Sequence, residues 1–248
     1  MRLVAHQLAA EQRMFWRSRE AAVFIFVFPL LLYALLSSVY SDEIDGVPSA
    51  DVLLAGLFGY GAANTAFAGL AIILVGRREA GILKRLRATP LPPSAYVTAV
   101  LLSTLLVFAL QAAALLVLGA LAFGASAPAS WPGFVGAVVL GTACFAAMGV
   151  GAAALIRSAE GVSAVVNVVV LPMAFLSGSF GPTRDFPSVL EAIADVLPLT
   201  YLLEIVNGVY LDGESLLDFH QALAVLAVWG VAGLAVAARR FSWMPRER

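Results

Sequence analysis

Apolar residues gather along this chain into long runs, and these runs dominate its pattern. Several reach twenty or more residues without a charged side chain, enough to cross a hydrocarbon core of about 30 Å. Because backbone polar groups need partners inside lipid, each run is expected to be a helix. The pattern predicts an all-α integral membrane protein with six spans, at residues 21–40, 52–75, 95–123, 133–156, 161–180 and 219–238.

The segment before the first run, residues 1–20, is amphipathic and too polar to span. A helix over 1–17 gathers basic side chains on one side and apolar ones on the other, with Gln7 and Glu11 interrupting the apolar face. This pattern is typical of a helix lying in the membrane interface; a frayed basic tail is the alternative. The basic side holds Arg2, His6, Arg13 and Arg17, and the apolar side holds Leu3, Val4, Leu8, Met14 and Phe15.

A second segment that should not span is 181–218, which is too long for a simple turn. It contains a helix-like piece at 188–197 and an apolar piece at 199–211 that is too short to cross. Glu204 lies in the second piece, and a carboxylate at mid-membrane costs about 3 kcal/mol. We therefore expect two short helices that dip into the outer interface and return, with Glu204 in a polar crevice or near the surface.

Composition supports the membrane class: 61% of residues are hydrophobic and 12% charged, with a mean hydropathy of +0.93. A soluble domain has about twice that charged fraction. The net charge of −1 gives no reason to expect a nucleic-acid partner. Cys144 is the single cysteine, so the chain has no internal disulfide, and a small buried hydrophobe is the expected role.

The distribution of charge predicts the orientation. Of the 15 Arg and Lys residues, 14 lie in 1–20, 76–94, 157–160 and 239–248, while 11 of the 16 acidic residues lie in the intervening segments. Cytoplasmic loops carry the excess of Arg and Lys. Both termini and the 76–94 loop are therefore predicted to be cytoplasmic, and six spans fit this alternation.

The 76–94 loop holds a short amphipathic stretch at 77–88. As one helix, it places Ile82, Leu83 and Leu86 on one side, with Glu79 among them facing away from the arginines. Pro90, Pro92 and Pro93 then end the helix. Such a helix could transmit motion from a soluble partner, or it could simply set topology and bind anionic lipid headgroups.

This loop resembles the one after the second span in ABC-2-type permeases, the membrane subunits of ATP-driven exporters. The matching positions are Glu79, Gly81, Leu83, Leu86, Thr89, Pro90 and Tyr96. A second match covers 171–209 and is similar to the end of the family's fifth span and the outer segment. It is carried by Pro172, Ser177, Gly178, Pro182, Pro187, Pro198, Leu199, Thr200 and Tyr201. Gly181 departs from the family, where many members have a bulkier residue.

The resemblance implies that residues 1–248 form a single transmembrane domain, half of a transporter, without a nucleotide-binding domain. It implies a second permease copy, identical or a close paralogue, and a separate ABC ATPase on the cytoplasmic side. The 77–88 helix would then be the coupling helix. The residues implied to couple are Glu79, Gly81, Ile82, Leu83, Leu86 and Arg87, and those of the outer re-entrant pair are Pro198, Thr200, Tyr201 and Glu204.

Nucleotide chemistry is absent from the sequence itself. Gly76 and Gly81 have P-loop spacing, but Ile82 follows where lysine is required. The chain is therefore predicted to be no enzyme and to bind no cofactor, with ATP and Mg held by the partner ATPase. The two histidines, His6 and His220, are expected on opposite sides of the membrane, so no metal site is predicted.

Polar residues are scarce within the spans, and Asn64 and Asn167 fall near mid-depth of the second and fifth. The resemblance places these two spans around the cavity between paired subunits. Alternatively, the amides bond only to neighbouring helices, for about 1 kcal/mol each. The substrate-lining set implied is Asn64, Thr65, Phe67, Asn167, Met173 and Phe175.

These expectations combine into an exporter permease of the plasma (inner) membrane, in contact with membrane lipids. It would move a hydrophobic or amphipathic solute such as a drug, lipid or glycolipid outward by alternating access. An ATP-independent secondary transporter or channel is one alternative, although the spans hold few titratable groups. A membrane scaffold that transports nothing is the other, although it would leave the outer 181–218 segment unexplained.

Overall fold

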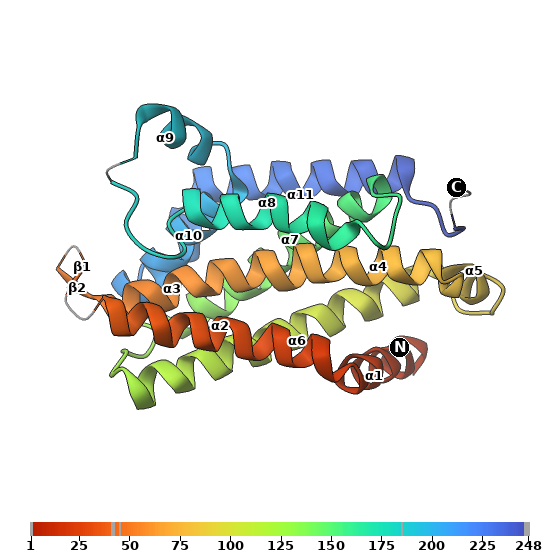
Figure 1. The fold of residues 1–248 in the computed structure, drawn as a ribbon, viewed down its shortest axis with the longest axis horizontal. Coiled ribbons are helices and arrows are strands. Elements are labelled where there is room, and N and C mark those ends of the chain that lie inside the picture. Colours follow the sequence, from red (N-terminus) through yellow and green to blue (C-terminus); the bar gives the residue numbers. More distant parts are fainter. Residues whose placement is uncertain (1, 41–42, 45, 185, 246–248) are drawn as a thin grey trace.

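The fold is a bundle of long helices with two short strands (Figure 1). In this computed structural model, residues 2–40, 43–44, 46–184 and 186–245 are described. The α-helices are α1 Arg2–Arg17, α2 Arg19–Val39, α3 Ser49–Ala62, α4 Leu70–Glu79, α5 Ile82–Arg87, α6 Pro93–Ala122, α7 Trp131–Leu155, α8 Val162–Leu176, α9 Ser188–Ala194, α10 Pro198–Asn207 and α11 His220–Arg240. The other elements are β1 Glu43–Ile44, β2 Val47–Pro48, the π-helices η1 Ala63–Gly69 and η2 Gly208–Asp212, and the 3-10 helix η3 Leu216–Asp218.

Five of the described helical stretches are long and apolar enough to cross a membrane, which confirms a multi-pass, mainly helical membrane protein. They correspond to five of the six predicted spans. The second span is longer than predicted, because α3, η1 and α4 join into one continuous helix from 49 to 79. The five stretches are Ala22–Val39, Ser49–Glu79, Pro93–Ala122, Trp131–Leu155 and His220–Arg240.

The predicted span at 161–180 is realised as the shorter helix α8, which has 15 residues. At 1.5 Å per residue its axis is about 22 Å long. Turn residues follow the helix, and Gly178 adopts a φ of +83°, a left-handed conformation that ends helices. The predicted span therefore included four residues, 177–180, that lie beyond the end of the helix.

The bundle has two distinct ends (Figure 1). The N-terminus, the C-terminus and α5 lie together at one end, which we call the α5 end. The β1–β2 hairpin and α9 lie at the opposite end, which we call the α9 end. The hairpin pairs Glu43 with Pro48 and Ile44 with Val47.

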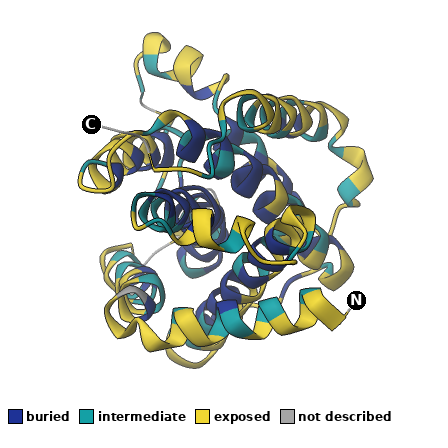
Figure 2. Ribbon diagram, turned by 90° about the vertical axis from the view of Figure 1, so that its right-hand side faces the viewer, coloured by how far each residue is buried: buried dark blue, intermediate teal, exposed yellow. Residues whose placement is uncertain are grey.

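The continuous helix 49–79 forms the centre of the bundle. Of its most apolar 18-residue window, 83% is buried, against 11% for α11, and buried residues fill the interior seen from the α5 end (Figure 2). Gly149 of α7 lets that helix approach η1 closely, since an added Cβ would meet the Ala66 and Phe67 carbonyls at 2.8 and 2.7 Å. The second span therefore connects both ends of the molecule through its core.

Candidate functional site at the α5 end

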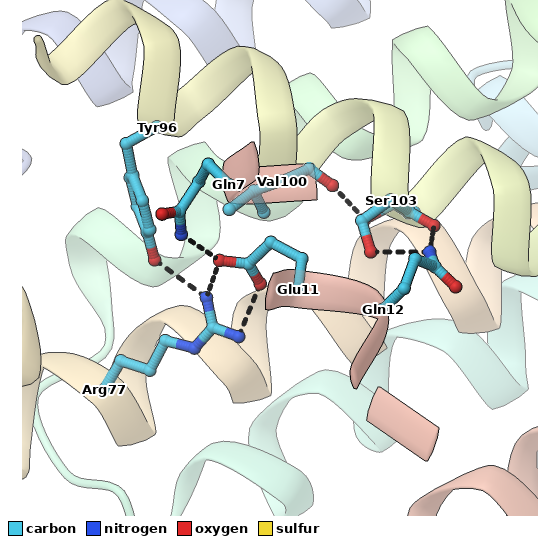
Figure 3. A network of polar contacts seen from close by, with 8 residues as sticks. Gln7, Glu11, Gln12, Arg77, Tyr96, Val100 and Ser103 are labelled. Atoms are coloured by element: carbon cyan, nitrogen blue, oxygen red, sulfur yellow. Dashed lines mark hydrogen bonds and ion pairs between the residues drawn. The ribbon is translucent and has the colours of Figure 1, made fainter. Parts of the chain in front are cut away.

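Arg77, near the end of α4, makes a paired contact with α1. Its Nη1 and Nη2 donate to Oε1 and Oε2 of Glu11 at 3.0 and 2.6 Å, and Nη1 also donates to the Tyr96 hydroxyl of α6 at 2.9 Å (Figure 3). The Glu11 side chain is only 3% exposed. A two-point arginine–carboxylate pair fixes both distance and orientation. This pair therefore joins α1, α4 and α6 at one point.

Two glutamines of α1 extend this attachment (Figure 3). Gln7 Nε2 donates to Glu11 Oε1 at 2.9 Å, while Gln12 Nε2 donates to the Oγ and carbonyl oxygen of Ser103 on α6 at 2.9 and 3.1 Å. The predicted helix is present, and its basic side is exposed as expected. On the opposite side Val4, Leu8 and Phe15 are half-buried, whereas Leu3 and Met14 are exposed. Of the two polar residues that interrupt this side, Glu11 binds Arg77 of α4 and Gln7 binds Glu11.

Arg78, the next residue, points to a different helix. It is 1% exposed, and its Nη1 and Nη2 donate to the carbonyl oxygens of Ala153 and Ile156 at 2.8 and 2.6 Å. These carbonyls lie at the C-terminal end of α7, where the last turn has no partners within its own helix. The guanidinium satisfies them and places positive charge at the negative end of the helix dipole.

Two predictions about the 77–88 stretch are wrong. Glu79 does not face away from the arginines, because its Oε1 accepts a hydrogen bond from Arg78 Nε at 2.9 Å. The stretch is also not one helix: α4 ends at Glu79, and α5 begins at Ile82 after Gly81 with a φ of +70°. A left-handed residue there breaks the helical path and reorients α5.

The predicted coupling residues divide by exposure. Ile82 is 37% exposed, and Arg87 is exposed as well. Leu86 and Gly81 are half-buried. Leu83 is different, since it is 0% exposed and belongs to the hydrophobic core. Of the three apolar residues predicted on one side of the helix, Leu83 therefore packs inside this chain and is not available at its surface.

The six predicted lining residues do not meet in one cavity of this chain. Asn64, Thr65, Phe67 and Met173 are buried, and Thr65 Oγ1 donates to Gln111 Oε1 at 2.7 Å. Asn167 is exposed and its Nδ2 donates to the Ser163 carbonyl oxygen of its own helix at 2.8 Å; Phe175 is 60% exposed. Asn167 and Phe175 thus lie on the outside of the bundle.

The predicted outer pair is present as α9 and α10, which begins at Pro198. Thr200 Oγ1 contacts Ser177 Oγ at 2.9 Å and donates to the Ala194 carbonyl oxygen at 2.7 Å, and the Tyr201 hydroxyl donates to the Asp195 carbonyl oxygen at 2.8 Å. The Glu204 side chain lies on the outside of the bundle, and its depth relative to the membrane stays a prediction.

The sequence did not reveal the pairing of Glu11 with Arg77 or the role of Arg78. One signal was present: a carboxylate in the middle of the apolar side of an amphipathic helix needs a partner when it is buried. Which arginine supplies that partner depends on how α1 folds back onto the bundle, and no local pattern encodes this. Among the described residues, no cluster of three His, Cys, Asp or Glu side chains could hold a metal ion.

Comparison with known proteins agrees with this architecture. Residues 4–211 match the profile of the family described as ABC-2 type transporter. The chain therefore belongs to the ABC-2 type transporter family, and its fold is that of a membrane transport permease.

Two curated relatives are both called inner membrane transport permease YhhJ, one from Escherichia coli K12 and one from Shigella flexneri. Each is 26% identical over 179 residues, which cover 69% of this chain. The same match covers 48% of each relative, so the chain spans about half the length of the curated relatives it matches.

Proposed function

We propose that this chain is the permease subunit of an ATP-driven exporter and that α5 receives the motion of a separate ABC ATPase. The observation that carries this proposal is the pair of neighbouring arginines in the last turn of α4, one short turn before α5. Arg77 links α4 to α1 and α6, whereas Arg78 links it to the end of α7. A displacement of α5 would therefore act on several helices at once.

The proposed orientation places the α5 end in the cytoplasm. The segments rich in Arg and Lys all lie at or lead into this end, as cytoplasmic loops do. Both termini lie there as well (Figure 1), which requires an even number of crossings. Since α8 runs from the α5 end toward the α9 end, we assign it as the fifth of six spans, although its helix is short.

The proposed assembly contains two permease subunits, a homodimer or a pair of close paralogues, and ATPase subunits that hold ATP and Mg. Membership in the ABC-2 family supports this assembly. The proposed cargo is hydrophobic or amphipathic and leaves the cell by alternating access at the interface between the permeases. The scarcity of charge in the spans and the exposed positions of Asn167 and Phe175 on α8 support a path of this kind.

The test of this function is the variant Ile82→Asp, with Leu83→Asp as its comparison. Ile82 is exposed, so we expect Ile82→Asp to keep the thermal stability of the permease and to lower the recovery of co-purified ATPase at least tenfold. Leu83 is buried, so a charge there should unfold the α5 region and lower permease abundance. Lys84→Ala, an exposed change on the same turn, is the matched control.

Wild-type ATPase recovery and wild-type export by a stable Ile82→Asp variant would contradict the coupling assignment. Export by the purified permease without any ATPase would contradict the ATP-driven class. The two outcomes are separate, because the first concerns the docking surface and the second concerns the source of energy.

A further inference from the structure

A cavity of about 350 Å³ lies beside the Glu11–Arg77 pair, between α1 and α2 on one side and α4 and α6 on the other. Its size falls within the range of about 300–1,000 Å³ that small-molecule sites occupy. Its walls include Phe15 of α1, Ile25 of α2, Ile73 of α4, Val107 of α6 and Ile82 of α5. The proposed lining of the cargo path shares Thr65 with this cavity.

The cavity has the depth of one leaflet. It extends along the second span from Arg77 to Thr65, which is 12 residues or about 18 Å of helix. Half of a hydrocarbon core of about 30 Å is about 15 Å. Thr65 and Val107 both lie near the middle of their spans, so the cavity reaches from the α5 end to the centre of the bilayer.

The chemistry of the walls fits a hydrocarbon chain. Most polar side chains of the cavity already have partners: Arg77 and Glu11 bind each other, Thr65 donates to Gln111, and the Thr104 hydroxyl donates to the Val100 carbonyl oxygen at 3.0 Å. The remaining walls are mostly aliphatic and aromatic. A ligand with hydrogen-bonding groups along its length would find few partners there.

Exposed charged residues, two arginines and Glu20, lie next to the cavity in the sequence, at the turn between α1 and α2. Ser18, in the turn between α1 and α2, lines the cavity and is flanked in sequence by the exposed Arg17 and Arg19. Trp16, two residues before Ser18, stacks on Phe26 with ring centroids 5.5 Å apart, and tryptophan is enriched at the level of the headgroups. An anionic headgroup above a single acyl chain complements this arrangement.

We propose that the cavity holds one acyl chain of an anionic glycerophospholipid, with the headgroup over the turn at Ser18. The bound acyl chain lies between α1 and α2 on one side and α4 and α6 on the other, and it contacts Ile82 of α5. Lipid occupancy therefore acts on the same helix that the ATPase is proposed to move. If the α5 end is cytoplasmic, as proposed above, this lipid belongs to the cytoplasmic leaflet. The lipid site itself does not depend on that orientation.

The test uses the purified full-length chain in phosphatidylcholine vesicles that contain phosphatidylglycerol with a photoactivatable diazirine on one acyl chain. Irradiation and peptide mass spectrometry then locate the labelled residues. We expect labelling to concentrate on the cavity walls of α4 and α6, at least fivefold above α11. Gly76→Leu, where an added Cβ has open space, should fill the cavity and lower this labelling at least fivefold.

Gly161→Leu is the matched control, because Gly161 has the same open surroundings and does not line the cavity. Arg17→Gln together with Arg19→Gln should abolish the preference for phosphatidylglycerol over phosphatidylcholine carrying the same probe, and Arg157→Gln, another exposed arginine, should preserve it. Labelling spread evenly over all lipid-facing helices, or equal labelling by both lipids in the wild-type chain, would overturn the proposal. Neither readout needs an ATPase or transport, so failure here is distinct from failure of the proposed function.

Discussion

The two ends of the bundle differ in their main contacts, although the α9 end also holds a buried carboxylate, Asp51, which accepts a hydrogen bond from Ser126 N at 2.7 Å. At the α5 end, buried charges reach between helices, with Arg77 on Glu11 and Arg78 on the end of α7. At the α9 end, Phe58, Phe134 and Tyr210 pack ring against ring, with centroids 4.8 to 6.0 Å apart. Backbone contacts then tie η2 to the start of α7, such as Ser130 N to the Val209 carbonyl oxygen at 3.1 Å.

This difference indicates separate mechanical roles. Charge-assisted hydrogen bonds are strong and directional, so a few of them can transmit a displacement and then re-form in a new arrangement. Densely packed rings spread their stabilisation over many weak contacts and keep one geometry. We propose on this basis that the α5 end changes its arrangement during function and that the α9 end keeps it.

The largest expected effect is that of Arg78→Ala. The substitution leaves the Ala153 and Ile156 carbonyls without their donor and a void at a fully buried position. We expect a loss of about 3 kcal/mol in the free energy of unfolding, measured by reversible denaturation in mixed micelles. Arg85→Ala, at an exposed site on α5, should change this value by less than about 0.5 kcal/mol. Equal losses in the two variants would show that the buried contacts of Arg78 stabilise the protein no more than an exposed arginine does.

A smaller loss, about 2 kcal/mol, is expected for Glu11→Gln, because it leaves the Arg77 guanidinium buried without its counterion. The double variant Glu11→Gln with Arg77→Gln should lose less than the sum of the two single variants, since no unpaired charge remains. Because α1 then loses its attachment to α4, we also expect protease to cleave the chain at Ser18 faster than in the wild type. Additive losses would show that the two residues act independently, against the geometry of the pair.

The sequence predicted five of the spans far better than it predicted the contacts of the α5 end. Apolar runs predict crossing helices because burial in lipid depends on the local composition of each run. The partner of Glu11 and the burial of Leu83 instead depend on how α1 and α5 pack against helices distant in the sequence. The break at Gly81 had a local signal, a glycine inside a helical pattern, that the predicted continuous helix ignored.

The cargo path shows the same limit. The sequence placed Asn64 and Asn167 at similar depths, and the family resemblance implied that both line one cavity. In the structure, Asn64 is buried within η1 while Asn167 is exposed on α8. Rotation about each helix axis decides which side a residue faces, and the nearly uniform apolar composition of these spans gives little information about rotation.

The smallest effect is expected at the α9 end, for Tyr210→Phe. The Tyr210 hydroxyl donates to the Ser126 carbonyl oxygen at 2.6 Å, and burial raises the pKa of this phenol, so it remains a donor at all physiological pH values. Phenylalanine keeps the ring packing against Phe58 and Phe134 and loses one hydrogen bond, which corresponds to about 1 kcal/mol of unfolding free energy.

The control for this change is Tyr201→Phe, whose hydroxyl makes a similar bond at an exposed position and should cost less than about 0.5 kcal/mol. We also expect Tyr210→Phe to leave ATPase co-purification at the wild-type level, because the stacked rings hold the α9 end in place without that bond. Tyr210→Phe could instead cost as much unfolding free energy as Glu11→Gln, or it could lower ATPase recovery. Either result would show that a few directional hydrogen bonds determine the arrangement of both ends. The division between an end that rearranges and an end that stays fixed would then fail.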